Sequence, residues 1–112
     1  MAKKFIDWKR LEKLSAGNVD IQVSMAEKGL KLSEETGELS AELLAYIGSK
    51  NVSASSNIGN FKELTNAVLN EAMDVLNVTL DIINSLGVTD EQARDMFDKK
   101  LDKWESKVNK FL

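Results

Sequence analysis

Acidic side chains recur at helical spacing in two stretches of the chain. The first stretch, residues 31–44, reads KLSEETGELSAELL and carries four glutamates among its leucines: Glu34, Glu35, Glu38 and Glu42. The second stretch reads NEAMDVLNVTLDII and carries Glu71 and Asp74. Because residues three apart lie on one face of a helix, each stretch can present a pair of carboxylates to one ligand. Two such pairs on neighbouring helices are typical of a divalent-metal site in a bundle.

The composition restricts any metal site to oxygen ligands. The chain has no cysteine and no histidine, which excludes thiol nucleophiles, zinc sites, histidine acid–base catalysis and the Glu-x-x-His di-iron motif. Carboxylate oxygens suit hard cations such as Mg²⁺, Mn²⁺ and Ca²⁺. The net charge of −3 provides no broad electrostatic attraction to nucleic acid.

The sequence pattern predicts an all-α fold in one domain, residues 1–112. The chain is 43% hydrophobic and 29% charged, which is the globular range, and it contains no proline. Helical periodicity predicts four helices, with the expected ranges Ala2–Leu14, Asp20–Ile47, Asn60–Leu86 and Thr89 to the C-terminus. No apolar run reaches the length of a membrane helix, and charges interrupt the N-terminal segment, so we expect a cytoplasmic protein without a secretory signal.

Local signals mark the ends of these helices. Gly17 and Asn18 predict a stop after the first helix, and Gly87 predicts one after the third. Thr89 and Gln92 have the spacing of a capping box at the start of the fourth. The segment Gly48–Asn60 is rich in Ser, Asn and Gly, which predicts a long loop. Within it, Lys50–Asn60 is expected to be mobile and to contribute to substrate access.

The second helix is expected to place its acids beside its buried face. Leu32, Leu39, Leu43 and Tyr46 form one apolar stripe at helical spacing. Glu35, Glu38 and Glu42 border that stripe, whereas Glu34 points away from it.

The third helix is expected to place Glu71 in the middle of an apolar face. Val75, Val78 and Ile82 lie on that face, while Asp74 and Asp81 lie on its flank beside Asn70 and Asn77. A lone carboxylate in an apolar setting loses solvation unless a cation or hydrogen bonds hold it.

Simpler interpretations exist for each group. The glutamates of residues 34–42 can form a solvated helix face, and Glu71 can be a buried acid paired with a lysine. Trp8, Tyr46 and Trp104 can stack on a base or belong to the core. Considered jointly, EExxE on one helix and ExxD on the next favour the metal site.

The two acidic stretches, in this order, resemble the MazG-like all-α nucleoside triphosphate pyrophosphohydrolases. The motifs of that family are EExxE on one helix and ExxD on the next, matched here by residues 34–38 and 71–74. The resemblance extends more loosely to DWKRLEKL before them and MFDKKLDKW after them. It implies a four-helix MazG-like bundle completed by oligomerisation. It also implies Mg²⁺-dependent cleavage of an NTP or dNTP to the monophosphate and pyrophosphate, with Mn²⁺ as a substitute.

The resemblance also implies roles for individual residues. The expected metal ligands are Glu35, Glu38, Glu71 and Asp74. Glu34 and Glu35 are the expected catalytic acids, with Glu34 orienting or activating water. The expected substrate-binding residues are Lys31, Lys100 and Lys103 for the phosphates, and, independently of the resemblance, Asn77 and Trp8.

The expected partners are the nucleoside triphosphate and further copies of the chain, in a homodimer or homotetramer, with neither nucleic acid nor a membrane bound. The third helix is apolar on two separate arcs, so that it needs neighbours on both sides. The alternative function is a non-catalytic helical interaction module, an adaptor or antitoxin-like bundle in which the acids form salt bridges.

Overall fold

A computed structural model describes residues 4–20, 23–51 and 61–111 of the chain. These residues form four helices and no strand: α1 (Trp8–Asp20), α2 (Met25–Asn51), α4 (Phe61–Ser85) and α5 (Asp90–Asn109). The prediction of an all-α fold with four helices is therefore confirmed. In this part of the chain, every helix is too short or too polar to cross a bilayer.

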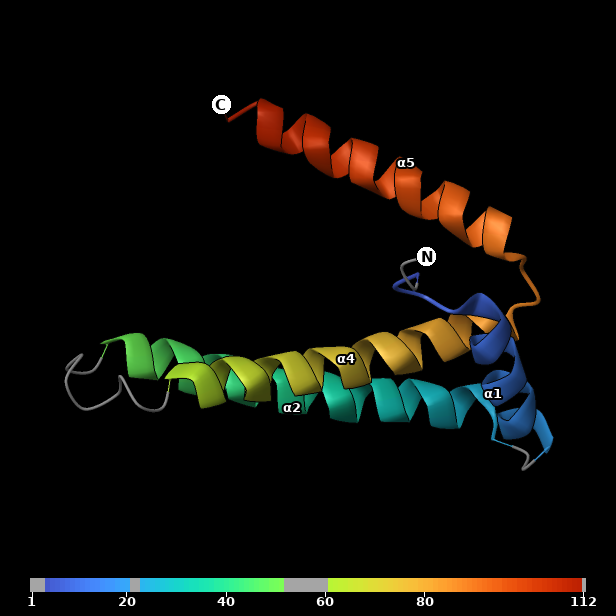
Figure 1. The fold of residues 1–112 in the computed structure, drawn as a ribbon, viewed down its shortest axis with the longest axis horizontal. Helices are drawn as coiled ribbons and strands as arrows, with labels where there is room; N and C mark the ends of the chain where they lie inside the picture. The colour runs from blue at the N-terminus through green and yellow to red at the C-terminus, as the bar shows by residue number, and fades with distance from the viewer. Residues whose placement is uncertain (1–3, 21–22, 52–60, 112) are drawn as a thin grey trace.

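The long helices α2 and α4 form the centre of the fold. They lie side by side and run in opposite directions, and α1 packs on α4 at one end of the pair (Figure 1). Helix α5 starts near that end and diverges from α4 along its length (Figure 1). The predicted loop Gly48–Asn60 begins later than expected, because α2 continues to Asn51. Its remainder, residues 52–60, lies outside the described residues, so its mobility stays a prediction.

Polar caps fix where the first two helices start. Asp7 accepts a hydrogen bond from the backbone N–H of Arg10 at 3.1 Å, and Ser24 Oγ accepts one from the N–H of Glu27 at 3.1 Å. Both bonds satisfy N–H groups that a helix start otherwise leaves free. The predicted starts at Ala2 and Asp20 were wrong, because these two caps outweigh the propensity of the residues before them.

Gly17 and Asn18 lie inside α1 rather than after it, so the predicted stop at Leu14 was also wrong. Asn18 donates to Asp81 Oδ2 at 2.9 Å, a contact that holds this turn against α4 and overrides its weak helix propensity. Gly87 follows the end of α4 at Ser85, as predicted, and its φ of +76° favours glycine. The capping box of Thr89 and Gln92 is also confirmed.

Polar residues occupy the most buried positions of the fold. Among the described residues, Ser15, Lys28 and Glu35 are buried, and no hydrophobic side chain reaches the same burial. The stripe predicted on α2 is half-buried at Leu32, Leu39 and Tyr46 and is exposed at Leu43. The α2–α4 interface therefore places polar groups where a small domain usually places its apolar core.

Candidate metal centre

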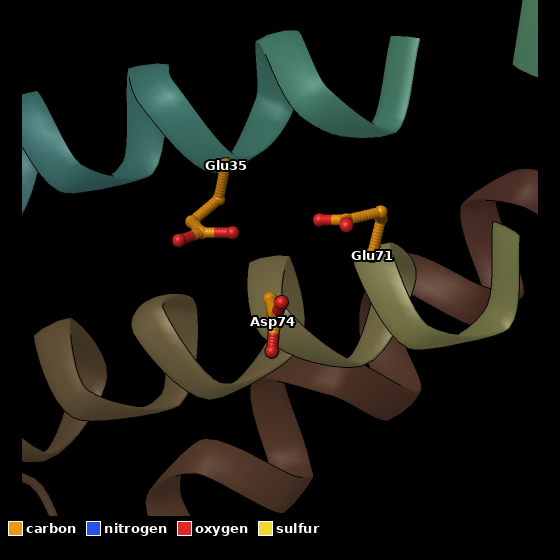
Figure 2. A group of neighbouring side chains, drawn as sticks. All are labelled: Glu35, Glu71 and Asp74. Carbon is orange, nitrogen blue, oxygen red and sulfur yellow. The ribbon is translucent and has the colours of Figure 1, made fainter. Parts of the chain in front are cut away.

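The packing of α2 against α4 brings three carboxylates together. Glu35 of α2 faces Glu71 and Asp74 of α4 (Figure 2). One oxygen atom from each of the three side chains lies within 4.8 Å of the other two. Glu35 is 6% exposed, and the other two residues are partly buried. Three negative charges at this separation repel one another unless a cation or protons offset them.

Two oxygen atoms of this group are buried without a hydrogen-bond donor. Within the described residues, neither Glu35 Oε2 nor Glu71 Oε2 receives a hydrogen bond. An unsatisfied buried carboxylate oxygen is costly, because it has lost water and gained nothing in exchange. The two residues come from facing helices (Figure 2), so a cation held between the three side chains would offset their charge.

Lys31 provides one cation at the edge of the cluster. Its Nζ lies 2.9 Å from Glu35 Oε1 and 3.8 Å from Glu34 Oε1. The hydrogen bond to Glu35 and the charge of Glu34 raise the pKa of Lys31 above its ordinary value. The lysine is therefore charged at neutral pH, and about half of its side chain remains exposed for other contacts.

Glu38 lies beside the cluster but is more exposed than its three members. The charge of Glu35 is the largest cause that raises the pKa of Glu38, followed by burial of its carboxyl group and a hydrogen bond to Glu35. Glu71 adds to this shift through its charge and a hydrogen bond. The neighbouring carboxylates therefore favour the protonated form of Glu38 more than water does.

The structure brings together most of the expected metal ligands. Glu35, Glu71 and Asp74 form the cluster, and Glu38 interacts with two of them. Glu34 points out of the cluster, as expected, with its side chain 59% exposed and paired with Lys31.

The expected substrate-binding residues are more widely spread. Lys31 contacts the cluster. Asn77 lines a cavity of about 530 Å³ between α1 and α4, together with Met73 and Asp81. Trp8 lines a separate cavity of about 370 Å³ at the start of α1, and its Nε1 is buried without an acceptor in the described chain. Lys100 and Lys103 belong to α5, which stands apart from α2 and α4 (Figure 1).

A second polar cluster lies further along the same helix pair and escaped the sequence analysis. Lys28 Nζ lies 3.3 Å from Asp81 Oδ1 and donates to Ser85 Oγ at 2.5 Å. Asp81 also accepts from Ser15 Oγ at 2.6 Å and from Asn18 at 2.9 Å. Lys28 precedes Glu35 by two helical turns and so shares its face, a spacing that could have revealed a buried lysine.

The two clusters differ in how their charges are compensated. Asp81 has a lysine and two neutral donors, which is the arrangement of a structural ion pair. Among the described residues, no lysine lies within ion-pair distance of Glu71. The alternative interpretation of Glu71 as an acid paired with lysine therefore has no support in this part of the chain.

Comparisons of the chain with protein-family models, with curated proteins and with solved structures found no match.

Proposed function

We propose that the chain is a Mg²⁺-dependent nucleoside triphosphate pyrophosphohydrolase. The supporting observation is the group formed by Glu35, Glu71 and Asp74, in which two buried carboxylate oxygens lack a donor. The donor set is all oxygen, which suits Mg²⁺, with Mn²⁺ as a substitute. The resemblance of EExxE and ExxD to the MazG-like family supports the reaction class.

In this proposal some side chains bind the cation and others bind the substrate. Glu35, Glu71 and Asp74 would hold the cation, with Glu38 as a fourth ligand. When bound, Mg²⁺ neutralises phosphate oxygens and lowers the pKa of a coordinated water. Lys31 is charged and half-exposed, so it can contact a phosphate oxygen beside the cluster. Glu34 holds Lys31 in place from the solvent side.

We assign the nucleoside to the cavity between α1 and α4. Met73 and Asn77 flank Asp74 in sequence and line the cavity between α1 and α4. A triphosphate bound at the carboxylates can therefore extend its sugar and base toward that cavity. The cavity combines apolar walls with the polar groups of Asn18, Asn77 and Asp81, a mixture typical of small-molecule sites.

Turnover of a nucleotide panel tests the proposal. The purified protein is incubated with each NTP and dNTP and Mg²⁺, and the monophosphate and pyrophosphate are quantified. We expect hydrolysis of at least one nucleotide, with loss of activity in EDTA and recovery with Mg²⁺ or Mn²⁺. Formation of the diphosphate and inorganic phosphate instead would contradict the proposed products.

The alternative function, a non-catalytic interaction module, draws support from one observation. Helix α5 and the turn that follows it expose Phe97, Trp104 and Phe111 at 62%, 66% and 91%, and such a surface is suited to binding another helix. Absence of turnover with every nucleotide, in protein that binds no Mn²⁺, would favour this module.

A further inference from the structure

Helix α5 is little covered by the other residues that the structure describes. Of its 20 residues, Asp90 and Ala93 are partly covered and the others are exposed. Isolated helices are marginal in water, because most helical stability in proteins comes from packing of an apolar face. The face that α5 would pack is present and large, so a partner surface is missing from the single chain.

The apolar residues of α5 and of the turn after it have the spacing of a two-helix seam. They occur at alternating intervals of four and three residues: Phe97, Leu101, Trp104, Val108 and Phe111. A strict repeat of seven residues with two apolar positions is the pattern of a coiled coil. In this repeat Leu101 and Val108 occupy the a positions, and Phe97 and Trp104 occupy the d positions. The seam therefore fits another helix along its length.

The exposed area of the chain is that of a subunit rather than of a compact monomer. The accessible surface is 8980 Å², whereas a compact monomer of 12.5 kDa has about 6200 Å². The radius of gyration is 17.7 Å, against about 13 Å for a compact domain of this length. The excess of about 2800 Å² is more than the roughly 800 Å² that each partner buries in a standard interface.

The charges beside the seam indicate which helix fits it. Glu91, Asp98 and Glu105 occupy the e positions, and Lys100 and Lys107 occupy g positions. In a parallel pair of identical helices, each g position faces the e position five residues further along the partner. Lys100 would then face the partner's Glu105, and symmetry repeats this pair. In an antiparallel pair e faces e and g faces g, which places like charges together.

We propose that α5 pairs in parallel and in register with α5 of a second copy of this chain. The interface consists of Phe97, Leu101, Trp104, Val108 and Phe111 from each copy, flanked by two Lys100–Glu105 pairs between the copies. This interface contains none of the three carboxylates of the cluster, Glu35, Glu71 and Asp74.

Charge exchange tests the seam and its direction together. Light scattering behind a sizing column should give twice 12.5 kDa for the wild type. Lys100→Glu and Glu105→Lys should each raise the dissociation constant of the dimer about tenfold or more, and the double variant should restore it. Lys99→Glu makes the same charge change on the outer face of α5 and should leave the dissociation constant unchanged. Circular dichroism checks that each variant keeps its helices.

Engineered disulfides provide the second test, because the chain has no cysteine of its own. Val108→Cys should form a disulfide-linked dimer under mild oxidation, since equivalent a positions approach within disulfide range in a parallel pair. Lys99→Cys should remain unlinked. The proposal would be overturned by a monomeric wild type or by tighter association of Lys100→Glu. It would equally be overturned if the double variant associated no better than its single variants, or if the two cysteine variants formed disulfide-linked dimers equally.

Discussion

Lys31 Nζ lies 2.9 Å from Glu35 Oε1, while Oε2 of the same carboxylate is buried and receives no hydrogen bond from the described residues. One oxygen of Glu35 is thus paired within its own helix, and the carboxylate faces Glu71 and Asp74 of α4 (Figure 2). The contact with Lys31 therefore leaves the second oxygen of Glu35 available to a cation.

Glu71→Gln should lower hydrolysis without lowering the stability of the fold. The amide keeps the size of the side chain and supplies a donor to the neighbouring carboxylates, so the metal-free protein should gain about 1 kcal/mol in unfolding free energy. Loss of a ligand should lower Mg²⁺-dependent hydrolysis by about 100-fold or more, since even groups behind the ligands typically cost 10–100-fold. Denaturant unfolding in EDTA and steady-state kinetics measure the two effects. Glu63→Gln, an exposed position on the same helix, should change neither, and activity of Glu71→Gln near wild type would contradict the ligand role.

Glu34 and Glu35 are adjacent and both pair with Lys31, which makes them matched variants. Calorimetric titration of Mn²⁺ should show a large loss of affinity for Glu35→Gln and a small one for Glu34→Gln. The reason is that the Glu35 carboxylate is buried in the cluster, whereas that of Glu34 is exposed. Equal losses in the two variants would show that Lys31, rather than the carboxylates, controls the site.

The free energy of unfolding of the metal-free protein should fall as the pH rises above the ordinary pKa of glutamate. The pKa of Glu38 is raised in the folded state above its ordinary value of 4.5, mainly by the charge of Glu35. The folded state therefore binds more protons than the unfolded state between the ordinary and the raised pKa, and stability falls as pH rises through that window. Unfolding in EDTA at a series of pH values measures this slope. Glu38→Gln should reduce it, and an identical slope in the variant would remove Glu38 as its source.

Asp81→Asn should destabilise the fold without removing the metal site. The change leaves buried Lys28 without its counter-charge, at an expected cost of about 3 kcal/mol. The double variant Lys28→Met, Asp81→Asn should recover part of this loss, because no charge then remains buried. Thermal unfolding measures the stability of both variants, and Mn²⁺ titration below their melting temperatures should give wild-type affinity. A parallel loss of metal affinity would mean that the two polar clusters act as one.

The site was largely predictable because its residues are local in sequence. Spacings of three residues place Glu35 near Glu38 and Glu71 near Asp74 on single helices, and the apolar residues around Glu71 indicate that the two helices face each other there. Glu38 is more exposed than its spacing predicts, because the orientation of α2 about its axis depends on packing and not on the repeat alone.

The ends of α1 and the Lys28–Asp81 pair were not predictable in the same way. Asn18 breaks helices in isolation, but in α1 its side chain bonds to Asp81, 63 residues later in the chain. Such contacts between distant residues override local propensity. The sequence of α5 shows its apolar repeat clearly, whereas only the structure shows that no part of the described chain covers Trp104 or Phe111.

The most direct test of the central proposal is the product analysis of nucleotide hydrolysis at increasing Mg²⁺, in wild type and Glu71→Gln. We predict equal amounts of monophosphate and pyrophosphate from at least one nucleotide, at a rate that saturates with Mg²⁺ and is lost in the variant. Absence of turnover with every nucleotide at saturating Mg²⁺, or turnover that Glu71→Gln leaves intact, would contradict a catalytic metal at Glu35, Glu71 and Asp74.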